Sequence, residues 1–242
     1  MKFGVISDIH GNIIALETVL NELKKENVDK ILCLGDIIGI GPHPNECIKA
    51  LISLGNQLIV VRGNHEGYFL NGIPKIIHDE KMKMSSEEIA HHQWVASCLS
   101  DESKALIREM KEEIVIECER KKIAMMHYPL NHQFGKYQRH VAIPTYQDAM
   151  EIFCELDADV YLFGHTHQKN TLHEAGKWFI NPGALGCPKG TNHAPYGILR
   201  IDENGVNYLE YEAEYDVENA IQDMKKLQYP DADMVLRVFY GK

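Results

Sequence analysis

The sequence has no apolar run that approaches the roughly 20 residues of a membrane-crossing helix, so we expect no membrane partner. Its first residues, MKFGVISDIHGN, combine one lysine with a short apolar run that Ser7, Asp8 and His10 interrupt. Because this segment lacks a long apolar stretch and a small-residue cleavage site, we expect a first strand there and not a signal peptide.

Paired cysteines are also missing. The 242 residues include six cysteines but no C-x-x-C motif, which argues against a disulfide framework and against a thiolate zinc site. Most of them lie in apolar segments such as KILCLG and EIFCEL, where we expect cysteine to act as a small buried hydrophobic residue. These features fit a protein of the reducing cytoplasm.

Positive charge is scarce: 25 Lys and Arg stand against 35 Asp and Glu, for a formal net charge of −10. No basic stripe of the kind that follows a nucleic-acid backbone is present, so we expect no nucleic-acid polymer as partner. Histidine is abundant, at 13 residues, and becomes informative only where several histidines converge. The sequence does not indicate an oligomeric state.

Strand and helix patterns alternate along the chain, which is typical of a sheet covered by helices. The expected strands lie at 2–6, 30–35, 57–64, 112–118, 121–127 and 160–164, followed by hairpins at 169–181 and 196–213. The expected helices lie at about 13–26 (capped by Asn12), 44–54 (closed by Gly55), 85–99, 101–110, 143–156 and 216–227. Without a linker, repeat or low-complexity segment, we expect a single domain over residues 1–242 with a helical insertion over about 66–112.

Side chains that commonly bind metals follow the expected strands where each strand ends. They are Asp8 and His10 after the first strand, Asp36 after the second, Asn64, His65 and Glu66 after the third, His127 after KKIAMM, and His165 and His167 after VYLF. Because loops at the carboxyl ends of strands meet at one edge of an α/β sheet, we expect these side chains to converge.

The types of these side chains indicate a metal site. Two aspartates, one amide oxygen and four imidazoles are too many ligands for one tetrahedral ion, but they suit two ions if one aspartate bridges. Four imidazoles disfavour Mg²⁺ and Ca²⁺ and favour two divalent or trivalent transition-metal ions: Mn, Fe or Zn, with Co or Ni also possible. Their local positive charge would attract a small phosphorylated substrate even to an acidic protein.

The motifs DIHG, GDIIG, GNHE and GHTH, with the isolated His127, resemble those of the calcineurin-like metallophosphoesterases. The resemblance extends from residue 8 to about 190 and includes INPGALG (180–186), which resembles a loop of the small bacterial and archaeal phosphodiesterase branch. Each motif alone is weak, but together, in this order and at strand ends, they form a specific signal. We therefore expect an α/β fold, a four-layer αββα sandwich that carries the helical insertion.

The resemblance implies a role for each candidate residue. The implied ligands are Asp8, His10 and His167 for the first metal, Asn64, His127 and His165 for the second, and Asp36 as the bridge between them. His65 would protonate the leaving oxygen or stabilise the transition state. The implied reaction is hydrolysis of a phosphate ester by a metal-bound hydroxide that attacks phosphorus in line.

Two positions depart from family patterns. Gly39 and Ile40 stand where protein serine/threonine phosphatases carry an Asp-Arg pair, in which the Arg grips phosphate and the Asp orients the catalytic histidine. This argues against a dedicated protein phosphatase and leaves open which residue orients His65. Ala184 and Leu185 replace the commoner Ser and Val of the loop, and we expect little effect because backbone amides would make the contacts there.

The segment 129–144 could be a solvent-exposed loop or a wall of the substrate site. The candidate contacts are Arg139 and His140 to phosphate, Phe134 and Tyr137 to a base by stacking, and, with less support, His193. For the other histidines we favour surface or packing roles: His91 and His92 on an expected helix, His43 in a turn and His173 in a hairpin.

These observations favour a phosphodiesterase acting on small nucleotidic substrates, such as dinucleoside polyphosphates or cyclic nucleotides. The alternative enzyme is a broad-specificity or protein phosphatase. A non-catalytic scaffold on the same fold, like the retromer subunit that lacks the catalytic histidine, is less favoured because His65 and all seven ligands are present.

Overall fold

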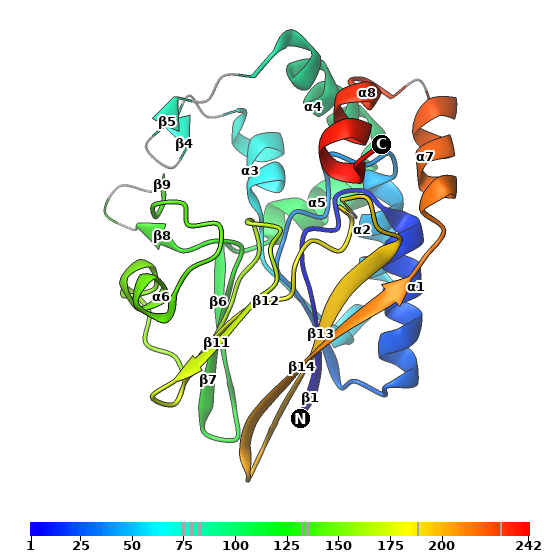
Figure 1. Cartoon of the computed structure of the whole chain (residues 1–242). Helices are drawn as coiled ribbons and strands as arrows, with labels where there is room; N and C mark the ends of the chain where they lie inside the picture. The colour runs from blue at the N-terminus through cyan, green and yellow to red at the C-terminus, as the bar shows by residue number, and fades with distance from the viewer. Residues whose placement is uncertain are drawn as a thin grey trace.

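The computed structural model describes residues 1–73, 76, 77, 80, 81, 84–131, 133, 136–187, 189–227 and 229–242. Two mixed five-stranded sheets face each other (Figure 1). The first has the order β14 (Gly205–Glu214), β13 (His193–Asp202), β1 (Lys2–Ile6), β2 (Lys30–Cys33) and β3 (Leu58–Val60). The second has the order β11 (Asn170–Glu174), β12 (Lys177–Asn181), β10 (Val160–Leu162), β7 (Lys121–Met126) and β6 (Glu113–Cys118).

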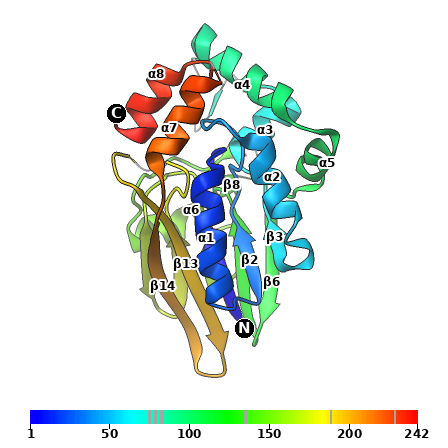
Figure 2. The same cartoon turned by 90° about the vertical axis from the view of Figure 1, so that its right-hand side faces the viewer.

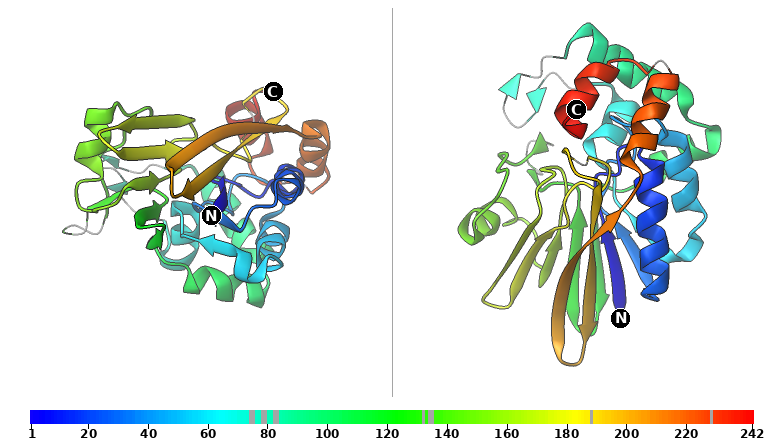
Figure 3. Two further views of the ribbon diagram at one scale, coloured as in Figure 1. Left: turned by 90° about the horizontal axis from the view of Figure 1, so that it is seen from below. Right: turned by 45° about the vertical axis from the view of Figure 1, so that its right-hand side comes forward.

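Helices cover the outer face of each sheet. Helices α1 (Ile13–Lys25), α2 (Pro44–Ile52) and α7 (Val217–Lys226) lie on the first sheet (Figure 2). Helix α6 (Tyr146–Ile152) packs on the second sheet through Ile152 and Phe153. A separate apolar cluster that includes Leu32, Ile123 and Leu162 fills the space between the sheets. The four-layer αββα prediction is confirmed, and Figure 3 shows the layers from below.

Further elements lie beyond the carboxyl ends of the parallel strands (Figure 1). They are α3 (Asn64–Asn71), α4 (Ser86–Cys98), α5 (Asp101–Glu109), α8 (Ala232–Val235) with a π-helical turn at Leu236–Tyr240, and the short pairs β4 (Ile76–Ile77) with β5 (Glu80–Lys81) and β8 (Leu130–Asn131) with β9 (Lys136–Tyr137). Helices α3, α4 and α5 make up most of the expected insertion.

The parallel strands set the direction of the site loops. Strands β1, β2 and β3 run parallel in the first sheet, and β7, β10 and β12 run parallel in the second. Their carboxyl ends therefore point to the same end of the molecule, and the loops that leave them meet there. This arrangement brings residues from distant parts of the sequence together.

Several expected boundaries were wrong. Strand β3 ends at Val60, and Asn64 begins a helix that the strand pattern did not predict. Helix α2 ends at Ile52, and Gly55 opens a 3-10 turn (Gly55–Gln57) and does not close the helix. Cys154, expected to be buried, is exposed and lies after the end of α6 at Ile152.

Helix α6 is also shorter than expected. The predicted span was 143–156, but Thr145 caps the helix and its hydroxyl accepts a hydrogen bond from the Asp148 N–H at 3.2 Å. Capping by Thr145 fixes the start of the helix inside the span that periodicity alone suggested.

Gly35 provides a test of how closely the loops after β2 and β3 pack. Its φ is +89°, and a Cβ there would lie 2.5 Å from the backbone nitrogen of Gly63. Gly55 also has a positive φ, of +53°, but a Cβ there would have nothing within 4 Å. We expect Gly55→Ala to lower the free energy of unfolding by about 1 kcal/mol and Gly35→Ala by about 3 kcal/mol, because strain and a backbone clash add. Urea denaturation measures both, and equal losses would contradict the close packing.

Candidate metal centre

The seven predicted ligands lie together where the loops after β1, β2, β7 and β10 meet the start of α3. One group is formed by Asp8, His10 and His167. The His10 Nε2 and His167 Nε2 atoms are 3.0 Å apart, and Asp8 Oδ1 lies 3.4 Å from His167 Nε2 and 3.7 Å from His10 Nε2. Asp8 and His10 are fully buried.

A second group is formed by Asn64, His127 and His165. The Asn64 Oδ1 atom lies 2.8 Å from His165 Nδ1 and 3.1 Å from His127 Nε2. The two imidazole nitrogens are 3.3 Å apart. Three potential ligand atoms thus face a common point.

Asp36 lies between the two groups. Its Oδ2 atom is 3.2 Å from His127 Nε2 in the second group and 3.8 Å from His10 Nε2 in the first. The Asp36 side chain is only 2% exposed, so an ion bound to its carboxylate would also lie next to the imidazoles around it. This position is the one that a bridging ligand requires.

Backbone carbonyls select the nitrogen that two of the histidines present. His127 Nδ1 lies 2.7 Å from the Leu34 carbonyl and His10 Nδ1 lies 3.3 Å from the Ile38 carbonyl. A carbonyl only accepts hydrogen bonds, so each Nδ1 carries the proton and donates it. In the neutral form of each ring, which a metal ligand must adopt, Nε2 then keeps a lone pair directed at the cluster.

Glu66 belongs to the GNHE motif but was not assigned a role from the sequence. Its carboxylate is fully buried. It accepts backbone N–H hydrogen bonds from Asp36, Ile37, Ile38 and Gly63 at 2.8–3.0 Å. Burial and the nearby Asp36 nevertheless raise the pKa of Glu66 to about 7. Glu66 therefore fixes the loop that carries Asp36. The sequence signal for this role was the position of Glu66 three residues after Gly63, where the acidic residue of a capping box stands.

Backbone strain is concentrated in the same loops. Positive φ angles occur at Asp8 (53°), His10 (47°), Asp36 (51°), His165 (68°) and His167 (58°). Residues other than glycine rarely adopt this conformation, and such strain tends to collect at functional sites. The packed sheets hold five of the seven candidate ligands in this unfavourable state, which supports a functional role for the cluster.

The buried carboxylates draw positive charge into the cluster. Burial alone would raise the pKa of Asp36, but His127 and His65 outweigh it and hold that pKa well below its ordinary value. Burial would lower the pKa of His127, but Asp36 and Asp8 raise it to about 9. The pKa of Asp8 is raised by burial, which His167 and His127 offset only in part. A bound cation would relieve both carboxylates.

His65 stands next to Asp36 and is positioned by packing. Its backbone N–H donates to Asp36 Oδ1 at 2.9 Å, and its Nε2 lies 3.9 Å from Asp36 Oδ2. A Cβ at Gly39 would lie 2.1 Å from His65 Nδ1. The ring centroids of His92 and Tyr68 lie 5.3 Å and 5.5 Å from that of His65. Gly39 therefore leaves the space that the imidazole fills, where the protein phosphatases carry an Asp-Arg pair.

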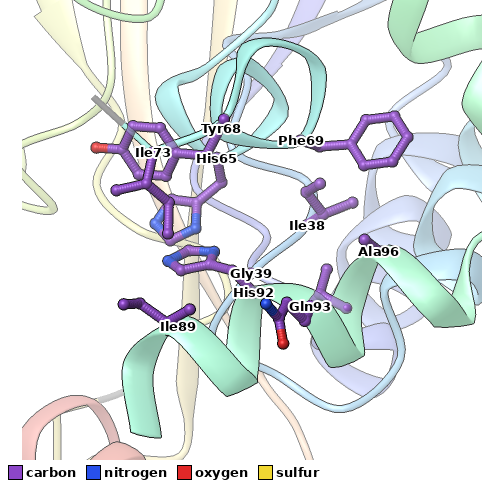
Figure 4. A pocket seen from close by; sticks show the side chains of 12 residues that line it. Ile38, Gly39, His65, Tyr68, Phe69, Ile73, Ile89, His92, Gln93 and Ala96 are labelled. Carbon is purple, nitrogen blue, oxygen red and sulfur yellow. The ribbon is translucent and has the colours of Figure 1, made fainter. Parts of the chain in front are cut away.

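A cavity of about 210 Å³ opens beside His65 (Figure 4). Figure 4 shows the imidazoles of His65, from α3, and His92, from α4, next to each other at one side of it, with Phe69 at the other. A second cavity of about 300 Å³ is lined by Asn64, His65 and His165, by residues of α4, and by residues of the C-terminal segment, here residues 231–239. Both cavities share His65, Tyr68 and His92.

The structure brings some of the substrate candidates to this site. The ring centroids of Tyr137 and His140 lie 5.4 Å and 5.8 Å from that of His165. Arg139 instead pairs with Asp148 at 2.7 Å and Glu151 at 3.1 Å on α6. His193 is exposed at the start of β13, opposite Glu214. Phe134 lies outside the described residues.

The other histidines divide between packing and the site. His91 is buried, and its Nε2 accepts the Ile40 N–H at 3.0 Å, which holds Ile40 at a φ of +58°. His43 lies 3.1 Å from Asp223, between α2 and α7, and His173 stacks on Trp178. These three have the structural roles that were expected. His92 also packs, against His65, Tyr68 and His91, and in addition it lines the cavities beside His65.

Cys187 was not predicted to be a metal ligand, because the sequence has no C-x-x-C motif to indicate a thiolate site. The ligand atoms of Cys187, His10 and His167 all lie within 4.8 Å of one another. Gly186 N–H donates to the Asp8 carbonyl at 2.9 Å, which holds this loop against the first site loop. Burial raises the pKa of the Cys187 thiol well above its ordinary value.

The donor set fits transition-metal ions. Groups of three donors from the cluster lie close enough to share an ion: His10, Asp36 and His65; Asp36, His127 and His165; and His10, His167 and Cys187. Imidazole, carboxylate and thiol donors suit such ions better than Mg²⁺ or Ca²⁺. Facing ring nitrogens 3.0 Å apart, as in His10 and His167, need a proton or a cation between them. The buried His, Asp and Cys side chains therefore have the composition and spacing of a metal site.

None of the helices in the described part of the chain combines the length and the apolar character that crossing a lipid bilayer requires.

Comparisons with known proteins agree with the site. The chain matches the family described as the calcineurin-like phosphoesterase superfamily domain over residues 1–204. It is 32% identical to the uncharacterized protein MJ0912 of Methanocaldococcus jannaschii, an alignment that covers 99% of this chain and 98% of that protein. It is 25% identical to phosphodiesterase YfcE of Escherichia coli, with coverage of 84% and 89%.

A solved structure shows the same fold. The crystal structure of the hypothetical protein PH1004 from Pyrococcus horikoshii has a TM-score of 0.82 to this chain, at 20% identity and with coverage of 98% and 97%. The family match spans most of the sequence, and the similarity to MJ0912 spans nearly all of it. The chain belongs to the calcineurin-like phosphoesterase superfamily and is a metal-dependent phosphoesterase.

Proposed function

We propose that this phosphoesterase is a phosphodiesterase with a dinuclear metal centre, acting in the cytoplasm on small nucleotidic substrates. The observation that carries the proposal is the Asp36 carboxylate, which lies between two groups of three potential ligands. A single ion would leave one group without a partner. The nitrogen-rich donor set favours Mn, Fe or Zn at both positions.

Each group of residues has a part in the proposed reaction. Asp8, His10 and His167 would hold one ion, Asn64, His127 and His165 the other, and Asp36 both. When bound, such a pair of ions lowers the pKa of water and neutralises charge on the phosphate. His65 would donate its imidazole proton, or a hydrogen bond, to the leaving oxygen. Glu66 would keep Asp36 in place through the four backbone N–H groups that it binds.

Small diesters are favoured as substrates for three reasons. The E. coli relative carries the name phosphodiesterase. The cavity of about 300 Å³ beside His65 is at the lower end of the volumes typical of small-molecule sites,. The net charge of −10 disfavours a polymeric nucleic acid,.

Replacement of His65 tests the catalytic assignment. We expect His65→Ala to lower kcat on bis-p-nitrophenyl phosphate with Mn²⁺ by about 10²–10⁴-fold, the usual range for general acid–base groups, while the metal content stays unchanged. His173→Ala, in the exposed β11–β12 hairpin, serves as the control and should keep full activity. Undiminished turnover by His65→Ala would remove His65 from this role. A wild-type protein that is inactive with Mn, Fe, Zn, Co and Ni would favour a non-catalytic scaffold.

Replacement of Asp36 tests the bridge. Since one carboxylate serves both ions, we expect Asp36→Asn to lose both, whereas Asp202→Asn, at an exposed turn, should retain two per chain. Elemental analysis after gel filtration measures the content, and circular dichroism checks that both variants fold. Two equivalents of metal in Asp36→Asn would refute the bridging assignment.

A further inference from the structure

The two cavities beside His65 are formed by parts of the chain that are far apart in the sequence. Helix α3 contributes Tyr68, helix α4 contributes His92, and the C-terminal segment contributes Met234 and Phe239. Figures 1 and 2 both show α8 next to α4 above the sheets. A group attached to a phosphate at the metal centre would meet these walls first, because Asn64, His65 and His165 line the larger cavity.

The walls of the cavities are apolar or aromatic. Phe69, Ile73 and Ile89 line the smaller cavity (Figure 4). Met234 and Phe239 line the larger one. Such surfaces bind planar rings through stacking and burial of apolar area. Burial lowers the pKa of His91 to about 3 and also lowers that of His92, so these imidazoles bring no positive charge at neutral pH.

The charged side chains of the cavity walls are both acidic. Glu88 on α4 and Asp231, directly before α8, line the larger cavity. Among the described residues that line either cavity, there is no lysine or arginine. Burial and the nearby carboxylates of Glu88 and Glu87 raise the pKa of Asp231, and the Arg237 guanidinium offsets part of that shift.

The acidic walls disfavour a substrate that places a second phosphate in the cavity. The phosphate that reacts is drawn to the metal centre, but a second phosphate in the larger cavity would meet the carboxylates of Glu88 and Asp231, and the described residues that line this cavity include no lysine or arginine. Like charges brought together across a binding interface are strongly unfavourable. An uncharged ring system would meet walls suited to it.

We propose that these cavities select an uncharged planar ester group, a nucleoside or aryl group bonded directly to the reacting phosphate, and reject substrates that carry further phosphates there. This inference rests on the proposed phosphodiesterase function and narrows it. Of the nucleotidic substrates, dinucleoside monophosphates and cyclic nucleotides fit the cavities, and dinucleoside polyphosphates do not. Glu88 and Asp231 are the residues that determine this specificity.

Two substrates test the proposal. Adenylyl-adenosine and diadenosine tetraphosphate carry the same two nucleosides, but the first joins them through one phosphate in a diester and the second through four phosphates linked by anhydride bonds. We expect kcat/KM of the wild-type protein to be at least about tenfold higher for adenylyl-adenosine, with products measured by chromatography. Equal hydrolysis of the two, preference for the tetraphosphate, or hydrolysis of neither beside an active bis-p-nitrophenyl phosphate reaction would overturn the selection of nucleosides proposed here.

Charge-neutralising variants identify the responsible residues. Glu88→Gln keeps a side chain that can close the capping box with Ser85, whose N–H donates to the Glu88 carboxylate at 2.7 Å,. Asp231→Asn suits the positive φ of 62° at that position,. The double variant should raise kcat/KM for diadenosine tetraphosphate, relative to that for adenylyl-adenosine, by about tenfold.

The control is Glu102→Gln, which removes an exposed charge in the first turn of α5 without lining either cavity. It should change neither substrate's kcat/KM. A double variant that folds, as judged by its thermal melting, and leaves the tetraphosphate reaction unchanged would overturn the assignment to Glu88 and Asp231. Failure of the wild-type protein to hydrolyse even bis-p-nitrophenyl phosphate would instead contradict the phosphodiesterase function itself.

Discussion

Three carboxylates, those of Asp8, Asp36 and Glu66, lie buried within one cluster of loops, and the need to compensate their charge governs the rest of the site. A buried carboxylate without partners is strongly unfavourable. Glu66 is compensated by four backbone N–H groups. Asp8 and Asp36 lie among imidazoles, which supply positive charge only when they are protonated or bound to a cation. Two divalent ions would satisfy both aspartates and leave each imidazole neutral, as a ligand must be.

This compensation also ties the two sheets together. In the second sheet, the backbone N–H of His165, after β10, donates to Asp8, which follows β1 of the first sheet. Likewise His127 Nδ1, after β7, donates to the carbonyl of Leu34, which follows β2. These two hydrogen bonds hold loops of the two sheets against each other. The positive φ angles of five candidate ligands persist because these contacts and the three apolar clusters fix the loops. Since the ions would bind only the assembled loops, metal binding should stabilise the packing of the sheets by mass action.

The alternation of strands and helices predicted a sheet covered by helices, and the metal-binding side chains at strand ends predicted the convergence of the seven candidates. The resemblance to the metallophosphoesterases added the four αββα layers. The sequence could not place His92, because its position beside His65 depends on how α4 crosses α3. Cys187 was missed for a similar reason, since its neighbours His10 and His167 are distant in the sequence. Helix α3 was hidden because Asn64 both follows a strand and begins a helix. Arg139 looked suited to phosphate, but Asp148 and Glu151 on α6 pair with it.

The proposed chemistry depends on Asp36 holding two ions. Crystals soaked in manganese and measured at its absorption edge test this most directly. We expect two anomalous peaks about 3.5–4 Å apart, the usual spacing of two-metal sites, one beside Asp8, His10 and His167 and the other beside Asn64, His127 and His165. One peak alone, or manganese bound only elsewhere on the chain, would contradict it.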